Sequence, residues 1–348
     1  MTLVNTASRT CYKPLVTLPA ETDVAIIGGG FAGCATAWAL AARGVGSVIL
    51  EREAELGRHA SGRGAGLGRQ LAEDDSTTAL TIRGAQILRE LGAVDPTGGI
   101  LGFDDHVHAR AYLTRATRFG LPHQAIDRAT VLARWPALTG VPLAMAIFVP
   151  SDGVIDIKAL LAAYAAGQTV VTETEVLAVD EHQLETSRGT IRARVVVDAA
   201  GAWAGATTGD APLDAYKRHL FLLEGAPIAP GTPYFWHLGT QELYLRAAGD
   251  ALLVSPCDAV PTTPLDQVAD AGAGDALREQ LQRFAPGLGG TLAQTWACQR
   301  AFTGDRQFRL GRDPRRPWLV WAAGLGGHGA TASGAVGQIV ADAVIAAL

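Results

Sequence analysis

Residues 24–33 read Val-Ala-Ile-Ile-Gly-Gly-Gly-Phe-Ala-Gly, and this stretch decides the fold of the chain. The apolar run at its start predicts a buried parallel strand. Gly28, Gly30 and Gly33 then complete the pattern G-x-G-x-x-G. In a dinucleotide-binding turn the first glycine permits the tight turn, the second lets the backbone approach a pyrophosphate, and the third lets helix and strand pack closely.

The residues that follow complete a β-α-β unit. Residues 32–42 predict a helix that ends near Gly44, and residues 48–50 predict a second strand with Glu51 at its end. The helix N-terminus offers unpaired N–H groups to phosphates, and the Glu51 carboxylate suits a ribose diol. A glycine-rich turn without a ligand is the alternative. The complete unit, with the acidic residue in place, favours a bound dinucleotide.

Similar small-residue turns recur along the chain. Residues 57–68 hold five glycines in twelve residues, a composition that favours a loop with exposed N–H groups over a stable helix or strand. A flexible surface loop is the alternative there. Residues 195–203 repeat the order of buried strand, acidic residue and small-residue turn, and residues 318–323 and 324–330 predict a strand and a glycine-rich turn. We therefore expect one site assembled from distant segments.

Composition and charge disfavour several classes of protein. The chain has 348 residues, with 29 Lys and Arg against 34 Asp and Glu, and the arginines are scattered, which disfavours nucleic acid as a partner. No signal peptide and no integral membrane segment is recognisable, so we predict a cytoplasmic protein. Cys11, Cys34, Cys257 and Cys298 lie far apart and indicate neither a disulfide framework nor a metal site.

The remaining elements are predicted from periodicity and turn residues. They are a loose N-terminal extension over residues 1–21, helices over 76–92, 156–166, 264–284 and 331–348, a meander of short strands within 169–192, and an antiparallel sheet within 213–256.

Four segments resemble the FAD-dependent amine and amino-acid oxidoreductases, the superfamily of D-amino acid oxidase, glycine oxidase and sarcosine oxidase. The segments are Asp23–Glu53, Arg58–Gly66, Val195–Trp203 with Gly205, and Trp296–Ile339. The likeness is closest to the D-amino acid and D-arginine dehydrogenases and to glycine oxidase-like enzymes. Together the segments span nearly the whole chain.

The resemblance implies an α/β fold with two domains. A Rossmann-like domain that binds FAD would comprise residues 1–80, 151–212 and 296–348. A discontinuous α+β substrate domain, built on an antiparallel sheet, would comprise residues 81–150 and 213–295.

The same resemblance implies residues for the cofactor. Glu51 would hold the adenosine ribose, Val176 would contact adenine through its backbone, and Ser61 and Arg63 would lie near the pyrophosphate and flavin. The full set is Gly28, Gly30, Phe31, Ala32, Gly33, Glu51, Arg52, Ser61, Gly62, Arg63, Gly64, Ala65, Val176, Ala200, Gly201, Trp203, Gly324, Gly326, Gly327, His328, Gly329 and Ala330.

The residues implied for catalysis are Arg300, Tyr244, Arg218 and His328. Arg300 lies in a stretch similar to that whose arginine binds the substrate carboxylate, a task that the planar guanidinium suits. Tyr244 resembles a tyrosine that hydrogen-bonds the same carboxylate. Arg218 and His219 both match the place of a second arginine, and alternation along a strand points only one of them to the pocket, with Arg218 favoured. His328 would steer flavin or substrate, and a structural loop histidine is the alternative.

Departures from the family bear on the flavin linkage and the substrate. Cys298 resembles the cysteine that attaches flavin in monomeric sarcosine oxidase, but a buried apolar filler is the commoner role, so we predict non-covalent FAD. Leu67 and Ala72 replace a histidine and a tyrosine of D-arginine dehydrogenase, and Thr331 replaces a lysine of sarcosine oxidases. These changes favour a more apolar or bulkier substrate side chain. His59 is expected to face solvent.

The predicted activity is oxidation of an α-amino or imino acid, a D-amino acid or a glycine derivative. Hydride would pass from Cα to flavin N5, and the imino acid would hydrolyse to a 2-oxo acid and ammonia. A 2-hydroxy acid dehydrogenase, oxidation of a tethered or larger amine, and a non-catalytic flavin-binding protein are the alternatives. Oxygen or a quinone would accept the electrons.

Overall fold

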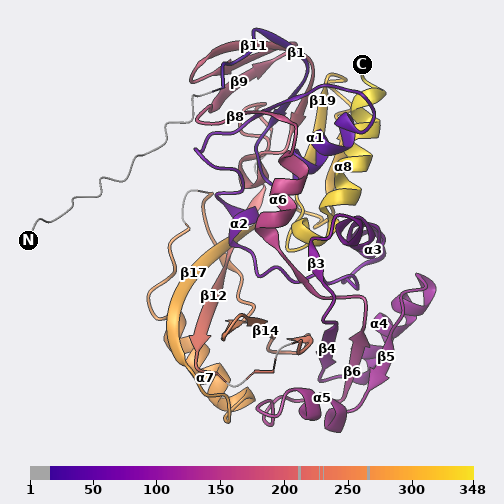
Figure 1. The fold of residues 1–348 in the computed structure, drawn as a ribbon, viewed down its shortest axis with the longest axis vertical. Coiled ribbons are helices and arrows are strands. Elements are labelled where there is room, and N and C mark those ends of the chain that lie inside the picture. Colours follow the sequence, from indigo (N-terminus) through magenta and orange to yellow (C-terminus); the bar gives the residue numbers. More distant parts are fainter. Residues whose placement is uncertain (1–15, 211–212, 227, 230, 265–266) are drawn as a thin grey trace, which may run out of the picture.

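The described chain has two large sheets, which lie one beyond the other along the longest axis of the molecule (Figure 1), and a small third sheet of two strands. The computed structural model describes residues 16–210, 213–226, 228–229, 231–264 and 267–348. Most of the N-terminal extension predicted for residues 1–21 therefore lies outside the described residues.

The first sheet has the predicted Rossmann-like arrangement. Its strand order is β18-β19-β11-β1-β2-β8, and all neighbours are parallel except β18 and β19. A hairpin of β9 and β10 extends β11. The strands are β1 (Glu21–Ile27), β2 (Val48–Leu50), β8 (Thr169–Val171), β9 (Val176–Asp180), β10 (Gln183–Thr186), β11 (Gly189–Asp198), β18 (Arg309–Arg312) and β19 (Leu319–Ala323).

Three helices cover one face of this sheet: α1 (Phe31–Ala41), α6 (Ile157–Ala165) and α8 (Gly329–Ile345). Side chains of β1 alternate, so that Val24 and Ile26 pack toward these helices while Ala25 and Ile27 belong to the core on the opposite face. Helices α1 and α8 approach closely, because a Cβ on Gly337 would lie 2.3 Å from the carbonyl oxygen of Ala35. Two separate apolar cores therefore hold the sheet between them.

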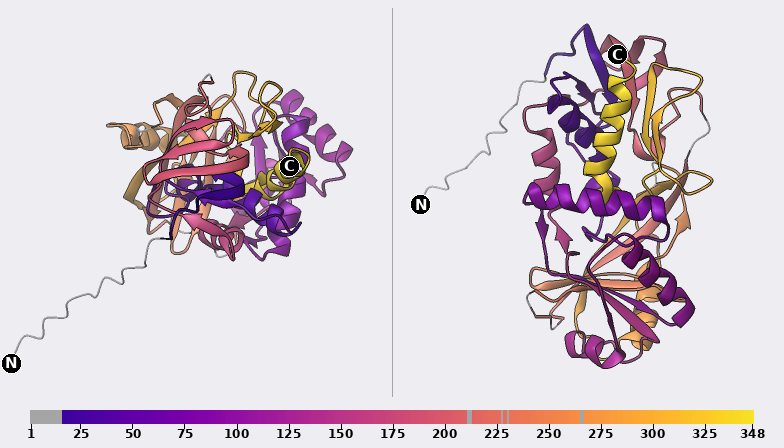
Figure 2. Two further views of the ribbon diagram at one scale, coloured as in Figure 1. Left: turned by 90° about the horizontal axis from the view of Figure 1, so that it is seen from above. Right: turned by 90° about the vertical axis from the view of Figure 1, so that its right-hand side faces the viewer.

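Helix α3 (Asp75–Glu90) crosses the end of α8 between the two sheets (Figure 2). The contact depends on Gly84, where a Cβ would lie 2.0 Å from the carbonyl oxygen of Thr331. The Asp74 side chain begins α3 by accepting a hydrogen bond from the Thr77 N–H at 2.8 Å. Helix α3 thus fixes the glycine-rich C-terminal turn against the second sheet.

The second sheet has the order β16-β12-β15-β14-β13-β4-β6-β5, with β17 paired to β12. It is antiparallel as predicted except between β4 and β13, which are parallel. Its strands are β4 (Gly99–Phe103), β5 (Gln124–Ile126), β6 (Met145–Val149), β12 (Asp214–Glu224), β13 (Tyr234–His237), β14 (Leu243–Ala248), β15 (Ala251–Ser255), β16 (Val260–Pro261) and β17 (Thr291–Phe302), and its helices are α4 (His106–Arg118), α5 (Arg128–Arg134) and α7 (Ala273–Phe284).

The structure confirms the predicted fold class and corrects several elements. The glycine-rich loop contains a four-residue helix, α2 (Ala60–Arg63), in which only one residue is glycine. Of the helix predicted over 264–284, residues 265–266 lie outside the described residues, residues 267–272 are not helical, and α7 begins at Ala273. The strand predicted to start near Val195 is the second half of β11, which runs unbroken from Gly189. Strands β3 (Val94–Asp95) and β7 (Val154–Ile155) pair at the junction of the sheets. The exact domain boundaries remain a prediction.

Candidate functional site

A cavity of about 490 Å³ extends from the turn after β1 to the second sheet. Most of the residues expected to contact the cofactor or substrate line it. They are Gly28, Gly30, Phe31, Ala32, Glu51, Arg52, Ser61, Gly64, Ala65, Val176, Ala200, Gly201, Trp203, Arg218, Tyr244, Arg300, Gly324, Gly326, Gly327, His328, Gly329 and Ala330. Gly33, Gly62 and Arg63 are not part of the wall.

Two glycines of the first turn, Gly28 and Gly33, occupy positions where a side chain would not fit. Gly28 has φ +101°, and a Cβ there would lie 2.7 Å from the carbonyl oxygen of Ala199. A Cβ on Gly33 would lie 2.0 Å from the carbonyl oxygen of Gly28. Gly33 therefore acts by close packing of helix against strand, which explains why it is absent from the cavity wall.

Glu51 is held at the end of β2 by two backbone groups. Its Oε2 accepts a hydrogen bond from the Gly29 N–H at 2.7 Å, and its Oε1 accepts one from the Glu53 N–H at 2.9 Å. The residue is 8% exposed. This anchoring leaves carboxylate lone pairs for hydroxyl donors at a fixed position on the cavity wall.

Arg52 and His59 pack on Trp203 next to this carboxylate. The Arg52 guanidinium lies 4.5 Å from the centroid of the Trp203 ring, and the His59 ring lies 4.8 Å from it. His59 Nε2 is 2.8 Å from Glu53 Oε1. His59, expected to face solvent, is only partly exposed: its side chain is 27% exposed, and its ring packs on Trp203 and lines the cavity.

Asp198, the acidic residue of the second strand-and-turn segment, does not line the cavity. Its carboxylate is fully buried and accepts hydrogen bonds from the Ala200 N–H at 3.1 Å and the Gly205 N–H at 2.8 Å. Burial raises its pKa to about 6. Asp198 therefore shapes the turn whose residues Ala200 and Gly201 line the cavity.

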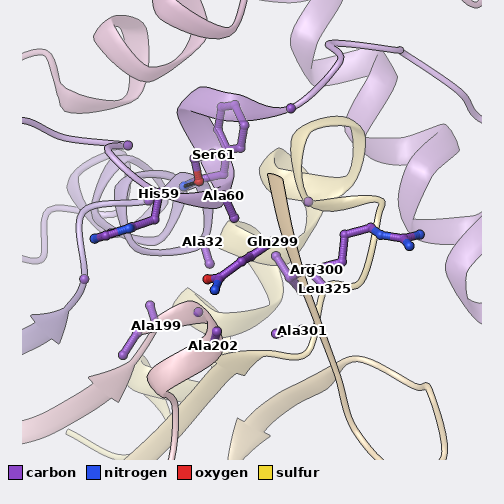
Figure 3. Close-up of a pocket in the computed structure, with 18 of the residues that line it drawn as sticks. Ala32, His59, Ala60, Ser61, Ala199, Ala202, Gln299, Arg300, Ala301 and Leu325 are labelled. Atoms are coloured by element: carbon purple, nitrogen blue, oxygen red, sulfur yellow. Dashed lines mark hydrogen bonds between the residues drawn. The ribbon is translucent and has the colours of Figure 1, made fainter. Parts of the chain in front are cut away.

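Strand register brings the substrate residues of the second sheet together. Arg218 of β12 pairs with Cys298 of β17, and Arg300 follows Cys298 by two positions, so all three share one face. Tyr244 of β14 pairs with Ser255 of β15 and reaches the same face. Figure 3 shows Gln299 and Arg300, neighbours on β17, pointing in opposite directions.

The two arginines converge on one stretch of backbone. Arg218 donates to the carbonyl oxygen of Cys257 at 2.9 Å, and Arg300 donates to that of Asp258 at 3.0 Å. Among the described residues one carboxylate is in reach of Arg218, that of Glu242 at 4.0 Å. In the described part of the chain no carboxylate lies within 4.0 Å of Arg300. Burial and then the charge of Arg218 lower the pKa of Arg300 to about 10, so it stays protonated at neutral pH.

The remaining groups at this end are aromatic. Tyr244 is 3% exposed, and burial raises the pKa of its hydroxyl. Its ring packs on Trp236 with the centroids 5.1 Å apart, and Trp236, which was not foreseen from the sequence, lines the cavity. His219 points away from the cavity, with Nδ1 2.5 Å from Asp258 Oδ2. Of the two neighbouring candidates on β12, only Arg218 lines the cavity, as strand alternation requires.

A second unforeseen residue, Arg69, lines the cavity beside His328. Its Nη2 donates to Glu73 Oε1 at 2.6 Å and lies 3.2 Å from His328 Nε2. Burial disfavours the charged guanidinium, but the attraction of the Glu73 carboxylate outweighs this effect, so the pKa of Arg69 is raised. Nothing in the local sequence pattern identifies Arg69, which follows the glycine-rich loop.

Cys298 lies on the cavity wall, where its surroundings favour the protonated thiol over the thiolate. Its Sγ is 3.6 Å from the carbonyl oxygen of Ala60. Burial raises its pKa to about 11, so little thiolate is present at neutral pH.

The residues of the cavity fit FAD. The turn after β1 has no room for a Cβ, the first turn of α1 presents N–H groups, and Glu51 is fixed where a ribose would lie. The wall continues past Ala65 to the C-terminal turn and the arginines of the second sheet. A long molecule with a nucleotide at one end and a reactive group at the other matches this layout.

Comparison with known proteins gives consistent results. A family model described as FAD dependent oxidoreductase matches residues 23–343. The chain is 29% identical to glycine oxidase of Geobacillus kaustophilus and 25% identical to monomeric sarcosine oxidase of Streptomyces avermitilis, in each case over 92% of both chains. The solved structure of the Geobacillus glycine oxidase superposes with a TM-score of 0.81 at 27% identity, covering 94% of this chain and 95% of that one. L-proline dehydrogenase from P. horikoshii has the same fold, with a TM-score of 0.85 at 24% identity and 93% of each chain covered.

Two kinds of feature are absent from the described residues. No helix there is long and apolar enough to cross a membrane. No group of three or more His, Cys, Asp or Glu residues there is placed to hold a metal ion.

Proposed function

Because the chain belongs to the family of FAD-dependent oxidoreductases, we propose that it oxidises an α-amino or imino acid, a D-amino acid or a glycine derivative. FAD supplies the hydride acceptor for the Cα–H bond of such a substrate. From a primary α-amino acid the imino acid so formed would hydrolyse to a 2-oxo acid and ammonia, whereas an N-substituted substrate would release the corresponding amine in place of ammonia. The relatives named glycine oxidase and sarcosine oxidase support this substrate class.

One observation carries the proposal. Arg218, Arg300 and Tyr244 share one face of the second sheet, at the end of the cavity remote from Glu51. Arg300 lacks a carboxylate partner in the described part of the chain. A cationic pair with a phenol at its side is the arrangement that an α-carboxylate needs.

In this proposal each residue has a positioning task. Arg300 and Arg218 bind the carboxylate and fix the orientation of Cα, and the Tyr244 hydroxyl adds a hydrogen bond to the same group. Trp236 and Tyr244 exclude water from the reacting end, because both rings pack against the apolar cluster of Leu220 and Cys298. Glu51 and the first glycine turn hold the adenosine portion of FAD.

The test is an anaerobic titration of the purified protein with D- and L-amino acids, glycine and sarcosine. Bleaching of the visible flavin band by one of these classes supports the proposal and names that class. Admission of air then separates an oxidase from a dehydrogenase that needs another acceptor. Bleaching by 2-hydroxy acids alone, or by no free amine or acid, would reject it.

A further inference from the structure

A bulge interrupts the second sheet beside the two arginines of the cavity. Strand β12 pairs with β15 as far as Val254 and with β16 from Val260. The intervening residues 255–259 lie opposite only residues 218–220 of β12, so the two segments differ in length and the ladder is broken between them. Bulges are common next to active sites, where they redirect groups that a regular ladder would use.

The bulge turns two backbone carbonyl oxygens toward the arginines. Arg218 donates to the carbonyl oxygen of Cys257 at 2.9 Å. The carbonyl oxygen of Asp258 accepts from Arg300 Nη2 at 3.0 Å and from Arg218 Nε at 3.4 Å. Cys257 has φ +57°, a left-handed conformation that costs free energy in a residue other than glycine. The carbonyl oxygen of Asp258 therefore holds two like-charged guanidinium groups side by side.

The Asp258 side chain fixes the bulge to His219, which lies on the face of β12 away from the cavity. Its Oδ1 accepts from the His219 N–H at 2.9 Å, and its Oδ2 lies 2.5 Å from His219 Nδ1. His219 Nε2 accepts from the Asp270 N–H at 2.9 Å, so Nδ1 carries the proton and donates to Asp258. The His219 carbonyl oxygen accepts from Ser255 Oγ at 2.7 Å. Side chains of the bulge thus satisfy the backbone groups of His219 that the broken ladder leaves unpaired.

The Asp258 carboxylate does not itself pair with the arginines. Among the described residues, His219 is the basic side chain within 4.0 Å of it. Burial opposes ionisation of this carboxyl, but the hydrogen bonds from His219 outweigh burial, so the pKa of Asp258 is lowered. A carboxylate on Arg300 would neutralise the charge that a substrate needs, whereas a carbonyl oxygen orients the guanidinium and leaves its charge in place.

We propose that Asp258 and His219 are positioning residues for the substrate carboxylate. They fix the bulge, and the carbonyl oxygens of the bulge aim the two arginines into the cavity. Neither residue lines the cavity, so neither contacts substrate. This inference depends on the proposed amino-acid oxidation, because it concerns the carboxylate of that substrate.

The main test measures binding of propionate to the oxidised holoenzyme, by the change in the flavin spectrum or by calorimetry. Asp258→Asn keeps the size of the side chain and an acceptor for the His219 N–H, but it turns an NH2 donor toward the protonated Nδ1. The Kd of propionate should rise roughly tenfold, because the guanidinium groups lose their orientation. If the wild type does not bind propionate, or if Asp258→Asn binds it as tightly as the wild type does, the inference is overturned.

The matched control for a purely structural role is His237→Gln, compared with His219→Gln. His237 is also a buried histidine of the second sheet, with Nδ1 2.8 Å from the carbonyl oxygen of Gln241 and Nε2 2.9 Å from that of Pro142, and it does not line the cavity. Both variants should unfold at a lower temperature than the wild type, but only His219→Gln should weaken propionate binding. Equal weakening by both would overturn the inference.

A double-mutant cycle with Arg300→Met tests whether Asp258 acts through this guanidinium. Asp258→Asn should weaken propionate binding by no more than about threefold in the Arg300→Met background, where only Arg218 is left to be positioned. A factor as large as in the wild-type background would show an effect independent of Arg300 and would contradict the positioning role.

Turnover separates this inference from the proposed function. With the best amino acid of the titration panel, Asp258→Asn should raise KM while kcat changes much less, and a fall in kcat at unchanged KM would overturn the inference. If no amino acid bleaches the flavin, the proposed function fails, whereas propionate binding still decides whether Asp258 and His219 position the arginines.

Discussion

Replacement of Arg300 by methionine is the most direct test of the carboxylate site. Methionine has similar length and keeps the apolar contacts, but it removes the group that we propose binds the substrate carboxylate. Loss of one partner of a desolvated charge pair costs about 2–5 kcal/mol, which corresponds to a rise in KM of roughly 30- to 5000-fold. Arg218 remains, so the effect should lie toward the lower half of this range.

The stability of the same variant should change little. In the folded protein Arg300 makes one hydrogen bond to backbone, at 3.0 Å, and its Nε has no partner in the described part of the chain. It also stands near the like charge of Arg218, which contributes to lowering its pKa. Removal of a poorly satisfied cation therefore costs little folding free energy.

The assay is steady-state kinetics with the best substrate from the titration panel, together with thermal unfolding. Arg306→Met is the matched control, because the Arg306 and Arg300 guanidinium groups lie 4.9 Å and 5.7 Å from the centroid of the same ring, Phe302, but Arg306 does not line the cavity. Arg300→Lys should give an intermediate KM, since lysine keeps the charge and loses the planar fork. A KM for Arg300→Met within threefold of wild type would refute the assignment.

Three other outcomes follow from the geometry. Gly28 has φ +101°, and a side chain there would meet the carbonyl oxygen of Ala199, so Gly28→Val should abolish retention of FAD. The ratio of flavin to protein absorbance measures the retained cofactor, and full flavin content would contradict this expectation. Acid precipitation should release all the flavin, since burial raises the pKa of Cys298 to about 11 and leaves little thiolate to attack it, and yellow protein in the pellet would show a covalent link. Burial raises the pKa of Asp152 from 3.8 to about 6, so the folded protein binds an extra proton and the free energy of unfolding should fall by about 2 kcal/mol as pH rises from 4 to 7. Urea titrations at pH 4 and pH 7 measure this fall in the free energy of unfolding, and Asp152→Asn should remove it. The same fall in the variant as in the wild type would contradict the role of Asp152.

The residues proposed for the cofactor could be chosen from the sequence because their signals are local. Gly28, Gly30 and Glu51 lie within one β-α-β unit, where residue type and spacing determine the geometry. Arg300 and Tyr244, chosen for their likeness to family residues, line the cavity, and of the neighbours Arg218 and His219 only Arg218 does. Their roles in binding substrate remain predictions.

What could not be predicted depends on contacts between distant segments. Arg69 and Trp236 lie 167 positions apart in sequence numbering, and only the packing of β13 beside the glycine-rich loop stacks them. His59 was expected to face solvent, whereas Trp203 and Glu53 cover part of its ring and leave its side chain 27% exposed. Burial of a loop residue is set by what packs over it, which a local pattern does not contain.

The position of β19 and α8 has a consequence for how the protein matures. Strand β19 pairs with β11 inside the sheet, and the turn after it forms one wall of the cavity, while α8 covers α1. A nascent chain that ends before residue 319 therefore exposes an unpaired edge of β11 and the apolar face of α1. FAD cannot be enclosed at that stage, so cofactor capture must come late in biogenesis, and a ribosome stalled before this point leaves a product prone to aggregation.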